Sequence, residues 1–496
     1  MKNSRLVSLL GSANEKLADR KIMRRYTAGI LTVGAALRFA WVFFKGSSIL
    51  PTEAFYEAAA FATRGDLADA YGPGTGLTAH LSPGMPLMVG TIYRWLGVGT
   101  PSAEFVLSCI SLAFIYISFL ALDAAFETLG AAPIARLAAL VLLALAPLNI
   151  SMEMGLFRYW EGAIAAAGIA LCLVRALELD ALDGRPSWLQ LGLLAGASGL
   201  MSLFSETAAL ACYGILGWLA LRKRGWIGFV GAAAASAALL IAISYPWALR
   251  NEAVFGEKVW TRSNFGFNFA LGYHDKAVSP SDPKKVFFDR LDEVSPFLHP
   301  AALASLKAAG GELGYNRLWI ARTEEWIGQH PAGALKIAAR HVWEFYFPPR
   351  WMWDTYAGES GSAPFKQAMM WIIAFAGFVS LGARLACRDW RYIYVAAALL
   401  LPMLPYVLGE PIIRYRFPVG GLLVFLAADI VWRTAQSALK LPPGWRLGAP
   451  WFFTDVISNG FVSPLAERRA AAFKGLRFGT APGSSSSICL GQLTLI

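Results

Sequence analysis

Long apolar stretches separated by short polar segments dominate the chain between residues 27 and 435. A helix needs roughly 20 apolar residues to cross a hydrocarbon core of about 30 Å, and many of these stretches approach that length. We predict about ten membrane spans, at residues 27–44, 101–123, 136–149, 159–177, 188–204, 207–221, 226–245, 365–383, 392–408 and 415–432. The pattern therefore predicts an all-α polytopic membrane protein, with up to 13 transmembrane helices if shorter interfacial helices also cross.

Two large intervals interrupt the apolar pattern and are predicted as loops on the outer face, at residues 45–100 and 246–364. Residues 1–26 are predicted as a cytoplasmic arm, and residues 27–435 as one membrane domain. The tail, residues 436–496, is polar, basic and rich in serine, so we expect it to be cytoplasmic and disordered.

Composition and charge agree with a membrane protein, since 56% of residues are hydrophobic, only 16% are charged and the mean hydropathy is +0.48. Basic residues cluster at 21–25, 222–224 and 384–391. If the N-terminus is cytoplasmic, as we expect, counting spans puts all three clusters in the cytoplasm, in agreement with the positive-inside rule. The net charge of +11 does not indicate nucleic-acid binding, because no basic stripe carries interleaved aromatic residues.

Cysteine and histidine spacing predicts neither a disulfide framework nor a structural metal site. None of the five cysteines lies between Cys212 and Cys387, so the second large loop contains none. The five histidines are scattered without the spacing of zinc ligands. The residues predict no particular cofactor, and a requirement for a divalent cation stays open.

Charged residues from distant segments fall at the outer ends of the predicted spans. They are Glu53, Glu57, Glu153, Arg158, Glu161, Glu206, Arg250, Arg262, Glu410, Arg414 and Arg416, with His80 in the first large loop. A carboxylate can take a proton from an attacking hydroxyl, and arginines can stabilise a departing phosphate. The pattern favours group transfer from a lipid phosphate to an outer acceptor. The plain alternative is that the glutamates are solvated loop charges and Arg414 and Arg416 are interface anchors.

Two other functions compete with an enzyme. A transporter or flippase of a lipid-linked substrate would usually carry internal repeats and charges near the bilayer midplane, and neither is evident here. A non-catalytic scaffold or catalytically degenerate enzyme is the second alternative.

Several motifs, in order along residues 27–435, resemble one enzyme family. They are Pro51-Thr52-Glu53-Ala54-Phe55-Tyr56, Gly76-Leu77-Thr78-Ala79-His80, Arg158-Tyr159-Trp160-Glu161, Pro246-Trp247-Ala248-Leu249-Arg250-Asn251, Arg262-Ser263-Asn264-Phe265-Gly266 and Arg414-Tyr415-Arg416-Phe417-Pro418. The chain resembles bacterial family 39 glycosyltransferases, relatives of protein O-mannosyltransferases and lipid A aminoarabinose transferases. That resemblance implies the GT-C membrane fold.

The resemblance implies an inverting hexosyl- or mannosyltransferase-like enzyme that uses a polyprenyl-phosphate sugar donor and a lipid, glycan or protein acceptor. Glu53 would be the catalytic carboxylate and Glu161 a second catalytic acid. Substrate binding would fall to Arg158, Arg250, Arg262, Arg414, Arg416, Glu57 and His80. The chain departs from the family pattern at Thr52, where many relatives have Asp, and at Ser82, where aminoarabinose transferases have Lys.

Overall fold

The computed structural model describes residues 2–45, 52–146, 148–297, 299–355 and 361–438. They belong to one compact unit, Met1–Leu447, while the second unit, Gly448–Ile496, lies outside the described residues together with nearly all of the predicted tail. Within the described ranges the chain is helical, and its only bridge pairs Ala68 with Leu77. The predicted all-α class is confirmed.

Among the described residues, six helices are long and apolar enough to cross a membrane, which makes this a multi-pass membrane protein. They are α2 (Arg20–Lys45), α5 (Pro101–Thr128), α8 (Gly162–Ala181), α10 (Glu206–Phe255), α18 (Ala363–Ala386) and α21 (Ile413–Ala438). A seventh candidate is the bent pair formed by α6 (Pro133–Leu145) with α7 (Ile150–Met154) and the short helix η1 (Leu156–Arg158).

The described residues of the ten predicted spans lie largely in helices. The number of spans differs because some of these helices are short and two predicted spans join in one long helix. Helix α9 (Trp188–Ser202) is only 15 residues long, and the region 392–408 is divided into α19 (Tyr392–Leu400), η2 (Leu401–Met403) and α20 (Leu404–Leu408). Helix α10 contains two predicted spans. Its two limbs meet at Gly225, whose φ of 70° and ψ of −164° suit glycine and break the helix.

The membrane core forms where α21 packs against α5, α6, α8 and α18, and α8 packs against α5. Phe126 and Phe425 stack there with ring centroids 5.1 Å apart. Small residues permit close helix contact, since a Cβ on Gly421 would lie 2.7 Å from Leu122. The helices thus pack closely through small residues at their crossings, as membrane helices usually do.

The basic clusters lie together at one end of the membrane helices, which we call the basic end. Arg20 pairs with Glu127 near the end of α5, Arg391 approaches the Thr128 carbonyl, and Arg222 pairs with Asp180 near the end of α8. Helix α1 (Lys2–Ala18) packs against α2 and α6, both of which start at this end.

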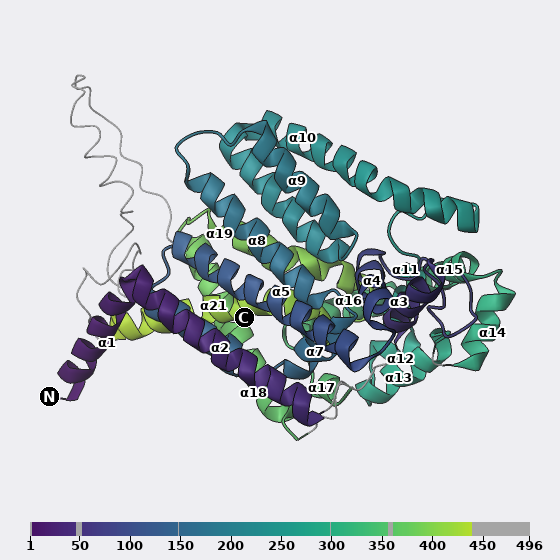
Figure 1. Cartoon of the computed structure of the whole chain (residues 1–496), viewed down its shortest axis with the longest axis horizontal. Helices are drawn as coiled ribbons and strands as arrows, with labels where there is room; N and C mark the ends of the chain where they lie inside the picture. Colours follow the sequence, from purple (N-terminus) through teal and green to yellow (C-terminus); the bar gives the residue numbers. More distant parts are fainter. Residues whose placement is uncertain (1, 46–51, 147, 298, 356–360, 439–496) are drawn as a thin grey trace. The chain divides into compact units, whose positions relative to one another are not determined.

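Short helices gather at the opposite end, which we call the loop end (Figure 1). They are α3 (Glu53–Arg64), α4 (Gly84–Leu96), α11 (Phe265–Gly272), α12 (Asp275–Val278), α13 (Pro283–Val294), α14 (Pro300–Ala308), α15 (Glu312–Gln329), α16 (Pro331–Tyr346) and α17 (Trp351–Thr355). Helix α3 packs on α4, and α11 packs on α15. These elements come from the two large predicted loops, so the loops assemble at the same helix ends.

Candidate functional site

Four helices begin at the loop end with charged residues in or beside their first turn. Glu53 is the first residue of α3, Glu161 is the N-cap of α8, Glu206 is the first residue of α10, and Arg414 is the second residue of α21. Carboxylates are stabilised there by the positive end of the helix dipole. Arg262, in the connection after α10, completes a mixed group of acids and arginines that we call the charged site.

Close approach of the first large loop to α10 brings Ser82 to this group. The Ser82 hydroxyl donates to Glu206 at 2.5 Å, and the Gly84 amide donates to the Leu203 carbonyl at 2.8 Å. A Cβ on Gly84 would lie 2.6 Å from that carbonyl, so a glycine is required here. Ser82 therefore holds Glu206 in place at the start of α10.

Arg262 and Arg414 are held by different partners. Arg262 lies 3.3 Å from Glu206. Its burial lowers the pKa, but the charges of Glu206 and Glu161 outweigh that effect and raise it, so Arg262 remains a cation. The Arg414 guanidinium lies 3.8 Å from the centre of the Trp160 ring and donates to the Tyr415 hydroxyl. The arginines thus come from separate segments to one end of the bundle.

Glu53 and Glu57 are one helical turn apart on α3 and differ in their surroundings. Glu53 is half-buried; burial raises its pKa, and Arg414 partly offsets the shift. Glu57 is fully buried, and neither carboxylate oxygen makes a hydrogen bond with any described residue. Burial, with the charges of Glu312 and Glu53, raises the Glu57 pKa well above its usual value, against smaller opposing effects of Arg250 and the Leu81 amide. Glu57 therefore stays protonated at pH values at which Glu53 is already ionised.

His80 and Tyr71 contribute neutral hydrogen-bonding groups next to this pair. The Tyr71 hydroxyl lies 3.1 Å from His80 Nδ1. Burial, with the Arg262 charge, lowers the pKa of His80 to about 3, so its ring is uncharged at neutral pH. Burial raises the pKa of Tyr71 well above its usual value, and Glu312 and Glu57 add to the shift.

Arg250 and Glu312 hold the loops in place. Arg250 donates to the carbonyls of Thr78 at 2.7 Å and Leu67 at 2.8 Å, and it pairs with Asp66 at 2.6 Å. Glu312 accepts hydrogen bonds from the Thr78 hydroxyl at 2.5 Å, the Ala79 amide at 2.9 Å and the Ser263 hydroxyl. Both side chains join the first large loop to the second and thereby fix the position of His80.

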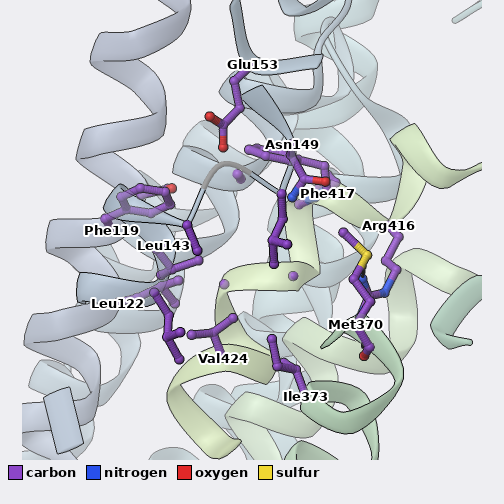
Figure 2. Close-up of a pocket in the computed structure, with 18 residues that line it drawn as sticks. Phe119, Leu122, Leu143, Asn149, Glu153, Met370, Ile373, Arg416, Phe417 and Val424 are labelled. Atoms are coloured by element: carbon purple, nitrogen blue, oxygen red, sulfur yellow. Dashed lines mark hydrogen bonds between the residues drawn. The ribbon is translucent and has the colours of Figure 1, made fainter. Parts of the chain in front are cut away.

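Arg158 and Arg416, also predicted as site residues, are directed elsewhere. Arg158 donates to Glu104 at 2.5 Å, inside a buried network. Arg416, three residues after the start of α21, contacts Met370 on α18 (Figure 2). Glu153 pairs with Arg38 at 2.8 Å, and Glu410 lies 3.4 Å from His341. The remaining predicted residues contact or electrostatically influence one another at the loop end.

Tyr71 and Glu312 were not predicted as site residues. The sequence signal for Glu312 is its place directly after Gly310 and Gly311, at the first turn of α15. Among the described residues, no group of three or more His, Cys, Asp or Glu is arranged to hold a metal ion.

Comparison with known proteins gives a likeness to solved structures only. No protein-family model matches the chain, and no curated protein matches it. One similar structure is the archaeal oligosaccharyltransferase AglB from Archaeoglobus fulgidus in complex with an inhibitory peptide and a dolichol-phosphate. It has 13% sequence identity and a TM-score of 0.46, over 87% of this chain and 53% of that one.

Another is an Archaeoglobus fulgidus oligosaccharyltransferase in complex with Zn and sulfate, with 12% identity and a TM-score of 0.43, over 84% of this chain and 50% of that one. The chain thus spans about half the length of the structures it matches. At this level of similarity no residue role is taken from either structure.

Proposed function

We propose that this protein is a membrane glycosyltransferase of GT-C architecture and family 39 type. It moves a sugar from a polyprenyl-phosphate donor to a lipid, glycan or protein acceptor, with inversion, at the outer face of the bacterial inner membrane. The observation that carries the proposal is Glu57, a fully buried carboxyl group whose oxygens have no hydrogen-bond partner among the described residues. It lies one turn from Glu53, in a site that also receives Arg262 and Arg414.

The two carboxyl groups of α3 suit unequal roles. Glu53 takes the proton of the acceptor hydroxyl or amine, because a raised pKa makes it a stronger base while nearby Arg414 favours its ionised form. Glu57, which holds its own proton, donates a hydrogen bond into the site. Neighbouring acids with separated pKa values are a common arrangement for acid and base work.

Arg262 and Arg414 are placed to stabilise the phosphate leaving group. The acceptor atom bonds to the anomeric carbon from the side opposite the phosphate, and the electrons of the broken bond remain on the phosphate oxygen. Arg262 and Arg414 stabilise that growing charge, and Glu161, whose charge acts on Arg262, orients the acceptor. The Arg262–Glu206 contact of 3.3 Å leaves the arginine able to shift toward a phosphate.

The test uses membranes incubated with radiolabelled polyprenyl-phosphate sugars, with and without the protein. We expect a new labelled product, and we expect Glu53→Gln to lower the transfer rate about 10²–10⁴-fold because glutamine cannot take a proton. Glu252→Gln is the matched control, since Glu252 is an exposed glutamate near the end of α10.

Full transfer activity in Glu53→Gln would remove Glu53 from the base role. Movement of labelled lipid across the membrane without a new covalent product would identify a flippase instead and overturn the proposal.

A further inference from the structure

A polar cavity of about 450 Å³ lies at the loop end, and ligand sites in proteins commonly occupy about 300–1,000 Å³. Three segments line it: the first large loop within 71–78, the end of α10 with the residues after it at 254–257, and the region 306–317, where α14 leads into α15. Glu257 and Arg317 are exposed lining residues that form an ion pair at its mouth. Since charged side chains avoid lipid, the cavity opens toward water.

Glycine backbone forms part of the cavity wall. Gly310 and Gly311, in the turn between α14 and α15, have φ of 80° and 99°, a region that favours glycine. A Cβ on either of them, or on Gly76 in the first large loop, would meet nothing within 4 Å. All three glycines line the cavity, so no side chain of their own shields the peptide groups there. A ligand can therefore form hydrogen bonds with the main chain of the wall.

The buried part of the cavity is held together by its own hydrogen bonds. Thr78 and Glu312 both line the cavity and are buried, and the Thr78 hydroxyl donates to Glu312 at 2.5 Å. Glu312 also accepts hydrogen bonds from the Ala79 amide at 2.9 Å and from the Ser263 hydroxyl. These bonds join the first large loop to the start of α15, so the two walls keep their positions without a ligand.

Tyr71 links the cavity to the charged site. Its side chain lines the cavity, and its hydroxyl lies 3.1 Å from His80 Nδ1. The carboxyl groups of Glu53 and Glu57 both act electrostatically on Tyr71. A ligand that contacts Tyr71 is therefore bound next to the group of residues to which Glu53 and Glu57 belong.

The charges of the lining favour a neutral ligand. Its charged side chains are Glu257, Glu312 and Arg317. Arg317 is paired with Glu257, and Glu312 already accepts three hydrogen bonds, so the described lining leaves no cation for an anion such as phosphate. The paired groups can still accept and donate hydrogen bonds, and Tyr71 and Phe255 add aromatic surface. A saccharide matches this combination, because its hydroxyl groups both donate and accept while the faces of its rings are apolar.

We propose that this cavity binds the sugar units of a glycan acceptor, with their hydroxyl groups on Glu257, Arg317 and the glycine backbone and one ring face against Tyr71. The inference rests on the proposed function, since a bound saccharide is an acceptor only if the protein transfers sugars. It selects one of the three proposed acceptor classes. A lipid chain would need an apolar lining, and a polypeptide is usually bound along an extended groove or a sheet edge.

Isothermal titration calorimetry of the purified full chain, without donor lipid, tests binding directly. The probes are disaccharides of mannose, glucose, galactose and N-acetylglucosamine, and a serine-containing tetrapeptide represents a polypeptide acceptor. We expect the wild type to bind at least one disaccharide and not the peptide. The disaccharide that binds should also receive the radiolabel when it is added to the transfer assay.

The first pair of variants removes the ion pair at the mouth of the cavity. Glu257→Ala combined with Arg317→Ala removes both charges and leaves neither unpaired, so we expect disaccharide binding to weaken at least about tenfold. Lys285→Ala combined with Asp289→Ala is the matched control, because it removes an ion pair of similar exposure on α13 that does not line the cavity. We expect this control to bind the disaccharide as tightly as the wild type.

The second pair of variants fills the cavity without changing its charge. Ala309 directly follows α14 and lines the cavity, so the larger side chain of Ala309→Phe occupies the space of a sugar ring. Ala308→Phe is the matched control, because the preceding alanine is exposed and does not line the cavity. We expect Ala309→Phe to lose disaccharide binding and Ala308→Phe to keep it.

Loss of disaccharide binding in both cavity variants, with binding kept in both controls, supports the proposal. It is overturned if no disaccharide binds to the wild type, if a folded cavity variant binds as tightly as its control, or if the peptide binds in place of the sugars. If one cavity variant does not fold, the other decides.

The transfer assay separates this inference from the proposed function. A disaccharide that binds but stays unlabelled, in a protein that transfers sugar to another acceptor, overturns the acceptor role of the cavity. Absence of all transfer together with intact disaccharide binding contradicts the proposed function instead.

Discussion

Two glutamates in this protein are equally buried yet have opposite surroundings. Glu104 on α5 is 1% exposed and accepts hydrogen bonds from Arg158 at 2.5 Å, Tyr93 at 2.5 Å and Tyr159 at 2.7 Å. Glu57 on α3 is fully buried and accepts none from the described residues. Burial alone therefore does not distinguish these two carboxyl groups. The number of satisfied oxygens does, because a folded protein rarely leaves a buried polar group without a partner or a purpose.

The two glutamates are linked through one aromatic side chain. The Phe55 ring, on the same helix as Glu57, makes edge contacts with Tyr93 and Tyr159, with centroids 5.9 Å apart in each pair. These tyrosines also hydrogen-bond Glu104. The satisfied network thus forms a rigid support for α3, which carries the unsatisfied carboxyl group.

The largest expected effect is on stability, from Glu104→Gln. This change breaks the buried Glu104–Arg158 ion pair by removing its carboxylate, and breaking such a pair typically costs about 3–5 kcal/mol. Thermal unfolding of the purified protein should show a large fall in Tm. Adding Arg158→Met should recover much of it, because two neutral residues need no ion pair. An unchanged Tm in Glu104→Gln would show that the network does not support the fold.

Replacing Glu57 with glutamine should stabilise the protein, whereas the same substitution at Glu104 should destabilise it. Glu57→Gln removes a carboxyl group whose oxygens accept no hydrogen bond from the described residues. We therefore expect the free energy of unfolding to increase by roughly 1–3 kcal/mol at neutral pH, and we expect the rate of sugar transfer to fall. The unfolded glutamate titrates near 4.5, and folding raises that pKa. The gain should therefore vanish below about pH 4.5 and grow as the pH rises toward the folded pKa. A destabilised Glu57→Gln, or a gain independent of pH, would contradict this.

The sequence predicted the helices and the segments that carry charge because hydrophobic length and charge position are local properties. It did not predict Glu104, which lies inside an apolar stretch, nor that Arg158 is used to neutralise it. Arg414 and Arg416 look alike in sequence. They face different directions because two residues on a helix are about 200° apart, so one contacts Trp160 and the other Met370. Which residue a side chain contacts depends on the rotation of its helix about the helix axis and on the packing of neighbouring helices, and a local sequence pattern contains neither.

Phe55→Leu should have an intermediate effect and tests the link between the two glutamates. It removes the edge-to-face ring contacts with Tyr93 and Tyr159, and one with Tyr56, each worth about 0.5–1.5 kcal/mol beyond the area buried, while leaving an apolar residue in place. Tm should fall by less than in Glu104→Gln. The double variant should fall by less than the sum of the two, because each change loosens the same contact surface. Strict additivity would show that the glutamate network does not support α3.

Substitutions of Thr52 should have the smallest effect on stability. They also test whether a threonine at this position lowers the proposed transfer activity. Thr52 is the N-cap of α3, and its side chain accepts a hydrogen bond from the Phe55 amide at 3.4 Å. Aspartate caps helices equally well, so Thr52→Asp should change stability by only a few tenths of a kcal/mol, whereas Thr52→Ala should cost about 0.5 kcal/mol or somewhat more.

The new charge beside Glu53 should still be visible in the pH dependence of transfer. A second carboxylate next to Glu53 raises its pKa further, so the rise in transfer rate with pH should move to higher pH in Thr52→Asp. Thr52→Ser is the control, since it keeps the cap without a charge. An increase in the transfer rate of Thr52→Asp by the same factor at every pH would show that an acid at this position acts on the substrate. That result would contradict the roles proposed for Glu53 and Glu57.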